Sequence, residues 1–106
     1  MRRVLLRATA RRDITDHYVY LAENAGSAAA EKFLANADLS FQDLAAWPDM
    51  ATPLQSRLPE LAGMRKWRVK GFENFLIFYQ TRTDAVSIVR VLHASQDWWR
   101  LLDIEN

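Results

Sequence analysis

Residues 63–79, GMRKWRVKGFENFLIFY, decide how the rest of the sequence is interpreted. Within this stretch, residues 66–70 alternate strictly between bases and the apolar pair Trp67 and Val69. A period of two is that of a β-strand, because successive side chains point to opposite faces of a sheet. We therefore expect a strand with one basic and one apolar face. It follows a loop, residues 48–63, that holds all three prolines of the chain.

The residues that follow predict two further strands. Residues 71–74 predict a turn or bulge, and the next five, Phe75 to Tyr79, are apolar throughout, which is typical of a central strand covered on both faces. After a second turn at 81–84, the β-branched and mostly apolar residues 86–92 predict the last strand. Strands joined by such short turns pair antiparallel.

Upstream of this sheet, the hydrophobic period becomes that of helices. A first helix is predicted from Thr9, its expected N-cap, to residue 25, and Gly26 and Ser27 are expected to end it and to cap a second. The second helix ends before Trp47, because the residue before a proline is biased out of the helical region. So short a connection predicts an antiparallel helical hairpin. The two apolar stripes are Ile14, Tyr18, Leu21, Ala25 and then Ala30, Phe33, Ala37, Phe41, Leu44.

The two ends complete the pattern. Residues 2–7 predict a short strand, and Ser95 is expected to cap a terminal helix with Asp97 in its first turn. The predicted order is β-α-α-β-β-β-α. This is an α+β fold in which a helical hairpin packs on a small, largely antiparallel sheet with a C-terminal helix. A chain of 106 residues fits one such domain, spanning residues 1–106.

Composition excludes several classes of site. The chain has no cysteine, which excludes a disulfide framework, a cysteine-ligated metal and a thiol nucleophile. Two histidines are too few for a histidine-based metal cluster, and there is no glycine-rich phosphate loop or nucleophile motif, so we expect neither a metal nor a cofactor. The apolar run after the first arginines is too short for a signal peptide, and no run approaches the roughly 18 apolar residues of a membrane span. We therefore expect a cytoplasmic protein.

Charge is segregated along the chain, although the net charge is only +1. Residues 1–12 hold five arginines and no acid, residues 13–49 hold seven acids against Lys32 alone, and residues 65–70 hold four bases. Such blocks predict either separate acidic and basic faces or a solvated surface with internal ion pairs.

The basic strand has three interpretations. Arginine and lysine on one face of the strand within residues 65–70, with Trp67 on the opposite face, could hold an RNA backbone by phosphate contacts. The same charges could instead attract an acidic protein segment, or could guard an edge strand against unwanted pairing. We favour a protein partner.

One pair of side chains suits acid–base chemistry, His93 and Asp97, four residues apart. The structural alternative is a strand-end histidine that meets the first turn of the following helix, and we favour it because no nucleophile accompanies the pair. Arg90 lies within a strand, where it either contacts the partner or pairs with an acid such as Asp97 or Glu73.

Two adjacent tryptophans fall in the predicted terminal helix. Trp98 and Trp99 are about 100° apart on a helix, so both cannot point fully inward. Either one of them is a surface anchor for an interface, or they are partly buried against the helical hairpin.

Two of these blocks carry a resemblance to a known family. Residues 63–79 resemble the central signature of ParE toxins in the RelE/ParE superfamily, and residues 90–97 (RVLHASQD) are similar to that family's closing strand and turn. The helical hairpin of such toxins has a similar sequence pattern at Ile14, at Tyr18 and at the junction 24–29. The resemblance covers the whole chain. It implies a toxin neutralised by a cognate, ParD-like antitoxin.

The superfamily holds two activities, and the residues favour one of them. RelE-like relatives cut messenger RNA on the ribosome and place an arginine where this chain has Leu76. The resemblance to ParE instead implies a non-enzymatic toxin that poisons DNA gyrase and does not itself bind DNA. A ribosome-dependent endoribonuclease is the alternative. Gln96 stands where many relatives carry arginine, which leaves the target open. The residues expected to contact the target or the antitoxin are Arg65, Arg68, Lys70, Arg90, His93, Trp98 and Trp99, and no catalytic residue is expected.

Overall fold

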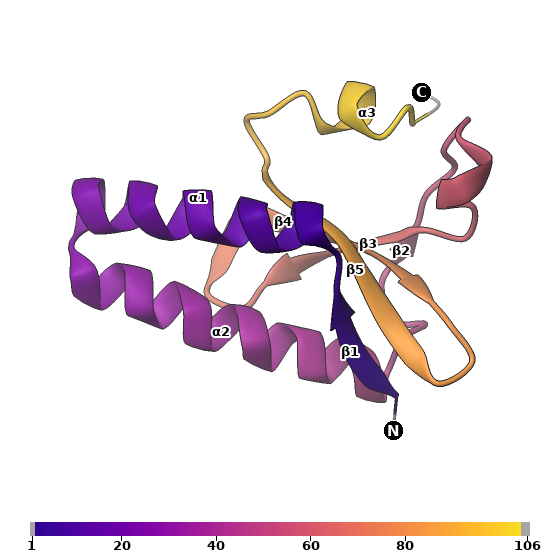
Figure 1. Cartoon of the computed structure of the whole chain (residues 1–106), viewed down its shortest axis with the longest axis horizontal. Coiled ribbons are helices and arrows are strands. Elements are labelled where there is room, and N and C mark those ends of the chain that lie inside the picture. Colours follow the sequence, from indigo (N-terminus) through magenta and orange to yellow (C-terminus); the bar gives the residue numbers. More distant parts are fainter. Residues whose placement is uncertain (1, 105–106) are drawn as a thin grey trace.

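The computed structural model describes residues 2–104, and its elements form a five-stranded sheet in the order β1-β5-β4-β3-β2. Two long helices cover one face of the sheet, and the C-terminal segment crosses the other (Figure 1). This arrangement confirms the predicted α+β fold, while a short strand (52–53) and a 3-10 turn (59–61) interrupt residues 48–63, which were predicted to be a loop throughout. The elements are β1 (Arg3–Leu6), α1 (Ala8–Ala25), α2 (Ser27–Ala46), β2 (Thr52–Pro53), η1 (Pro59–Leu61), β3 (Arg65–Val69), β4 (Phe72–Thr81), β5 (Ala85–His93) and α3 (Trp98–Leu101).

The sheet is largely antiparallel, with one parallel pair. β4 pairs antiparallel with both β3 and β5, while β1 runs parallel to β5 with Arg3 opposite Ala85 and Leu6 opposite Ile88. The register between β4 and β5 shifts between Phe78 and Tyr79, so that β5 has one extra residue there. Such a bulge bends the strand and increases its twist.

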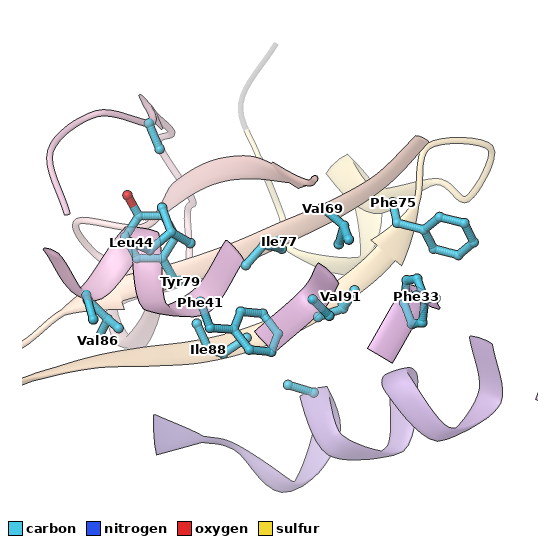
Figure 2. Packing of buried hydrophobic residues seen from close by; sticks show 14 residues of the cluster. Phe33, Phe41, Leu44, Val69, Phe75, Ile77, Tyr79, Val86, Ile88 and Val91 are labelled. Carbon is cyan, nitrogen blue, oxygen red and sulfur yellow. The ribbon is translucent and has the colours of Figure 1, made fainter. Parts of the chain in front are cut away.

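The helical hairpin builds the larger of two cores. Figure 2 shows Phe33, Phe41 and Leu44 of α2 packing on sheet side chains that include Ile77 and Tyr79. All five are at most 3 % exposed, so each contributes about 1.5–3 kcal/mol by leaving water. We call this cluster the helix-side core. The predicted hairpin and its apolar stripe on α2 therefore form as expected.

A second core lies on the other face of the sheet, and we call it the tail-side core. Phe78 and Leu92 of the sheet are fully buried there beneath Met64, Leu102 and Ile104. Trp98 and Trp99 are half-buried against this cluster and not against the helical hairpin. The expectation that they pack on the hairpin is wrong, because the chain crosses to the opposite face after β5.

Local details differ from the expected boundaries. The β3–β4 connection is tighter than predicted, because the turn is made at Lys70 and Gly71 and β4 already begins at Phe72. Gly71 has φ +74°, a conformation that favours glycine. The terminal helix is a single turn, and Ser95 does not cap it. Thr9 is likewise not the cap of α1, which begins at Ala8.

Candidate functional site

Polar side chains of α1 bind the backbone of β5 where that strand has no neighbour on one side. β1 pairs with β5 only as far as Ile88, so the outward groups of the following residues need other partners. Thr9 Oγ1 donates to the Val89 carbonyl at 3.0 Å. Asp13 Oδ2 accepts the Val91 N–H at 3.0 Å, and His17 Nε2 lies 2.7 Å from the Val91 carbonyl. Since these side chains are four residues apart, one face of α1 presents all three to the strand.

Asp13 also forms the best-buried ion pair among residues 2–104. Its carboxylate accepts two hydrogen bonds from Arg90, Nε at 2.7 Å and Nη2 at 2.9 Å. The hydrogen bonds that Arg90 donates to Asp13 raise the pKa of Arg90, against a smaller lowering by burial. The acids expected to pair with Arg90, Asp97 or Glu73, are not its partners. The guanidinium therefore holds α1 to β5, and a direct contact between Arg90 and a partner stays a prediction.

Arg65 faces the helix side of the sheet and secures the loop after α2. Its Nη1 donates to the Ala51 carbonyl at 2.8 Å, and its Nη2 lies 3.7 Å from an Asp49 carboxylate oxygen. Next to it, the hydroxyl of Tyr79 donates to the Pro48 carbonyl at 2.5 Å. Burial raises the pKa of Tyr79 to about 12. Arg65 and Tyr79 are opposite each other on β3 and β4, so the two side chains hold the loop together.

The remaining bases of β3 lie at its open end. β2 pairs only with Arg65 and Lys66, which leaves the outer edge of β3 free from Trp67 onward. Lys66 Nζ lies 4.8 Å from the centre of the Trp98 ring, and the Arg68 guanidinium lies 4.5 Å from that of Trp67. Both distances are those of cation–π contacts. A shallow groove of about 230 Å³ runs along this edge, lined by Thr52, Lys66, Trp67, Arg68, Glu73 and Leu76.

Lys70 combines a fixed backbone with an exposed side chain. Its N–H donates to Ser40 Oγ at 2.9 Å, and its carbonyl accepts from Asn36 Nδ2 at 2.9 Å. These two bonds tie the β3–β4 turn to α2. The ammonium group itself is free to meet solvent or a partner, as is Arg68.

His93 lies in a separate pocket of about 320 Å³ between α1 and the loop after β5. Its Nδ1 lies 2.7 Å from Ser95 Oγ and accepts the Ser95 N–H at 3.0 Å. His93 and Asp97 do not form the acid–base pair that was considered and disfavoured, and the Asp97 carboxylate lies 3.9 Å from Arg100 Nη1. The pocket is lined by His17, Tyr20, Phe75, His93, Ser95 and Gln96.

Phe75 separates the two histidines of this pocket. Its ring centre lies 4.9 Å from that of His17 and 4.9 Å from that of His93, both edge to face. Residues from α1 were not expected at this site, although His17 falls three positions after Ile14 and so beside the apolar stripe. Because histidine is polar, His17 was not assigned from the sequence to the face of α1 that packs on the sheet.

The two tryptophans share one environment on the tail side. Trp98 packs on Phe78 with ring centres 5.5 Å apart, and Trp99 meets Trp98 edge to face at the same distance. Both remain half-buried. The seven residues expected to bind a partner are thus spread over β3 and the turn after it, the Asp13–Arg90 contact between α1 and β5, the histidine pocket and the tail-side core, and do not converge on one site.

Within residues 2–104, no three side chains of the types His, Asp or Glu come together in a way that could hold a metal ion. No helix in that range is both long and apolar enough to cross a membrane.

Comparisons with known proteins agree with this geometry. The model of a protein family described as "ParE toxin of type II toxin-antitoxin system, parDE" matches residues 4–98. A solved structure titled "Chromosomal ParDE TA system from P. aeruginosa" superposes with a TM-score of 0.70 at 16% sequence identity. The superposition covers 88% of this chain and 96% of the other, so the two share a fold. No curated protein matches the sequence significantly.

Proposed function

The chain belongs to the ParE family of toxins of type II toxin–antitoxin systems, and on that basis we propose that it inhibits DNA gyrase by binding it. In this proposal a cognate, ParD-like antitoxin binds the toxin and neutralises it. The toxin acts in the cytoplasm, where gyrase is found, and needs no cofactor.

The closed tail side of the sheet is the observation that supports binding over catalysis. Leu102 and Ile104 are at most 8 % exposed and lie over the sheet residues Phe78 and Leu92. A nuclease needs cations and an acid or base around the scissile phosphate. On this face the middle strand offers the apolar Leu76, which packs against the same cluster, and the charged groups Lys66, Arg68 and Glu73 lie beside it at the β3 edge and not over the closed core.

The basic residues also favour a protein partner. Arg65 and Arg90 make intramolecular hydrogen bonds, and in this proposal we therefore assign them a supporting role. Arg68 on β3 and Lys70 in the turn after it are exposed cations, and Trp99 is half-exposed on the tail side. We assign charged contacts to Arg68 and Lys70, an apolar contact to Trp99, and a polar contact to His93. Arg65, Arg90 and Trp98 keep these groups in place.

Gyrase supercoiling in the presence of the purified chain tests the proposal directly. We expect loss of supercoiling and accumulation of cleaved DNA, and restoration of supercoiling when the antitoxin encoded beside the toxin gene is added. The double variant Arg68→Glu/Lys70→Glu should weaken inhibition about tenfold or more, because it reverses two interface charges. Supercoiling that is unaffected by excess toxin would refute the gyrase target. Cuts within translated codons during expression would establish the ribonuclease alternative instead.

A further inference from the structure

The start of the chain and the tip of the β4–β5 hairpin form one surface that is rich in arginine. Arg2 Nε donates to the Arg82 carbonyl at 3.0 Å, which places the hairpin tip beside the start of β1. β1 leads directly into α1 (Figure 1), and Arg11 and Arg12 of the helix line a hollow together with Leu6 of the strand. We call this region the arginine surface, and its cations are Arg2, Arg3, Arg7, Arg11, Arg12 and Arg82.

Few acids offset the charge of the arginine surface. Asp84 pairs with Arg3 at 3.2 Å, and these two side chains are 74% and 67% exposed. No acid among residues 2–104 forms an ion pair with the other five arginines, and the first turn of α1 contains no acid. Asp13 is engaged by Arg90, which leaves Asp16, one turn after Arg12, as the nearest further acid of α1. A chain with a net charge of only +1 therefore concentrates positive charge on this surface.

Arg7 lies at the centre of this charge and bonds only neutral acceptors within residues 2–104. Its Nε donates to Ser87 Oγ at 2.9 Å, and its Nη2 donates to Gln80 Oε1 at 2.5 Å. Burial lowers the pKa of Arg7, and the nearby charge of Arg82 lowers it further. The cations are thus close enough to repel one another, and an anion bound to the surface would relieve that repulsion.

The hollow beside Arg11 and Arg12 indicates which kind of anion suits the surface. It has a volume of about 630 Å³, and its lining residues include no aromatic ring: they are Leu6, Ala8, Arg11, Arg12 and Thr15. Protein interfaces are usually anchored by aromatic side chains, and single-stranded nucleic acid is held by stacking of its bases on such rings. A duplex presents its phosphates outward and needs neither. The hollow therefore suits the backbone of a duplex better than a protein segment or a single strand.

We propose that the arginine surface binds the phosphate backbone of duplex DNA without regard to base sequence. The planar guanidinium group can donate two parallel hydrogen bonds to one phosphate, and phosphate contacts carry no sequence information. A direct contact with DNA departs from the resemblance to ParE toxins, which implies that the toxin does not itself bind DNA. The contact does not require gyrase. Combined with the proposed function, it gives the toxin a second point of attachment, to the DNA on which gyrase acts.

Fluorescence anisotropy of a labelled DNA duplex, titrated with the full-length toxin, tests the proposal. Sequence-independent binding predicts a dissociation constant of roughly 10–100 μM at physiological salt, equal for two duplexes of unrelated sequence. The salt dependence counts the contacts, because each neutralised phosphate adds about −0.9 to the slope of log K against log salt. We expect a slope of about −3 to −4. It corresponds to the four arginines that neither pair with Asp84 nor bond Ser87, namely Arg2, Arg11, Arg12 and Arg82.

Two double variants with the same loss of charge test whether the arginine surface is the site. Arg11→Gln/Arg12→Gln should weaken DNA binding at least about tenfold at low salt and make the slope shallower by about 2. The control is Lys32→Gln/Arg100→Gln, which removes two exposed cations of α2 and α3 that lie outside the surface. It should bind DNA within about twofold of the unchanged toxin. Circular dichroism of both variants checks that they fold.

Four results would overturn the assignment. The first is no binding to duplex DNA at low salt, and the second is an equal loss in the two double variants, which would reduce the effect to net charge. The third is equal or tighter binding of a polyglutamate peptide, which would make an acidic protein segment the occupant. The fourth is tighter binding of duplex RNA of the same length. None of these results bears on inhibition of gyrase, because the assay contains no gyrase, so the two proposals fail separately.

Discussion

Replacing Asp13 by Asn should be among the most destabilising conservative changes in this protein. The Asp13 side chain is 11% exposed and the Arg90 side chain 26%. Removing one member of a buried ion pair costs about 3–5 kcal/mol, because the other charge stays buried without compensation. Because water partly reaches Arg90, we expect Asp13→Asn to lower the free energy of unfolding by about 3 kcal/mol, the lower end of that range. For a domain of this size the loss corresponds to a fall in Tm of roughly 12 °C.

Thermal and urea unfolding followed by circular dichroism would measure the effect. Asp16→Asn is the matched control, since Asp16 is an exposed acid on the same helix, and it should change stability by at most about 0.5 kcal/mol. The double variant Asp13→Leu/Arg90→Met should recover much of the loss, because it leaves no unpaired charge. A loss below about 1 kcal/mol for Asp13→Asn would refute the view that this pair holds α1 against β5.

Three further predictions concern stability. The pKa of Tyr79 in the folded protein is about 12, against the ordinary value of 10. The stability that this group contributes should therefore be fully present below pH 10, and the free energy of unfolding should fall by roughly 2–3 kcal/mol as the pH rises through about 12. Urea unfolding across that pH range should show a smaller fall for Tyr79→Phe. Gly71→Ala should cost about 1–2 kcal/mol in urea unfolding, because φ is +74° and the new methyl group would lie 3.1 Å from Asn36 Nδ2; an unchanged midpoint would contradict this. Trp98→Ala should cost about 2 kcal/mol in the same assay and Trp98→Phe clearly less, whereas equal losses would show that ring packing on the tail side is unimportant.

Periodicity predicted the layers of this fold, because hydrophobic spacing reports which face of an element is buried. The central strand containing Phe75 to Tyr79 is paired on both sides, and the stripe of α2 forms the helix-side core. The parallel position of β1 was not predicted, since four residues of strand pattern do not specify which edge they join. The tail-side core was missed for a related reason. The residues that cover the sheet there come from loop 54–64 and from the C-terminal segment, where the sequence has no regular period.

The candidate site was less predictable than the fold. Charge pattern identified Arg68 and Lys70 as exposed bases but could not distinguish them from Arg65, whose guanidinium bonds the loop after α2. The partner of Arg90 was missed because it lies 77 positions away on α1. A sequence signal did exist: Thr9, Asp13 and His17 repeat every four residues beside an apolar stripe. Such a polar row on the buried side of a helix indicates backbone groups that need partners.

The parallel pairing of β1 with β5 also governs when this protein can fold during synthesis. Arg3 to Leu6 leave the ribosome long before the residues opposite them, Ala85 to Ile88. Contacts between segments so distant in sequence form late, because the loop between them must be closed first. The helical hairpin can assemble from local contacts, whereas the sheet waits for β5. A ribosome that stops before residue 85 therefore releases an incomplete sheet and no functional toxin.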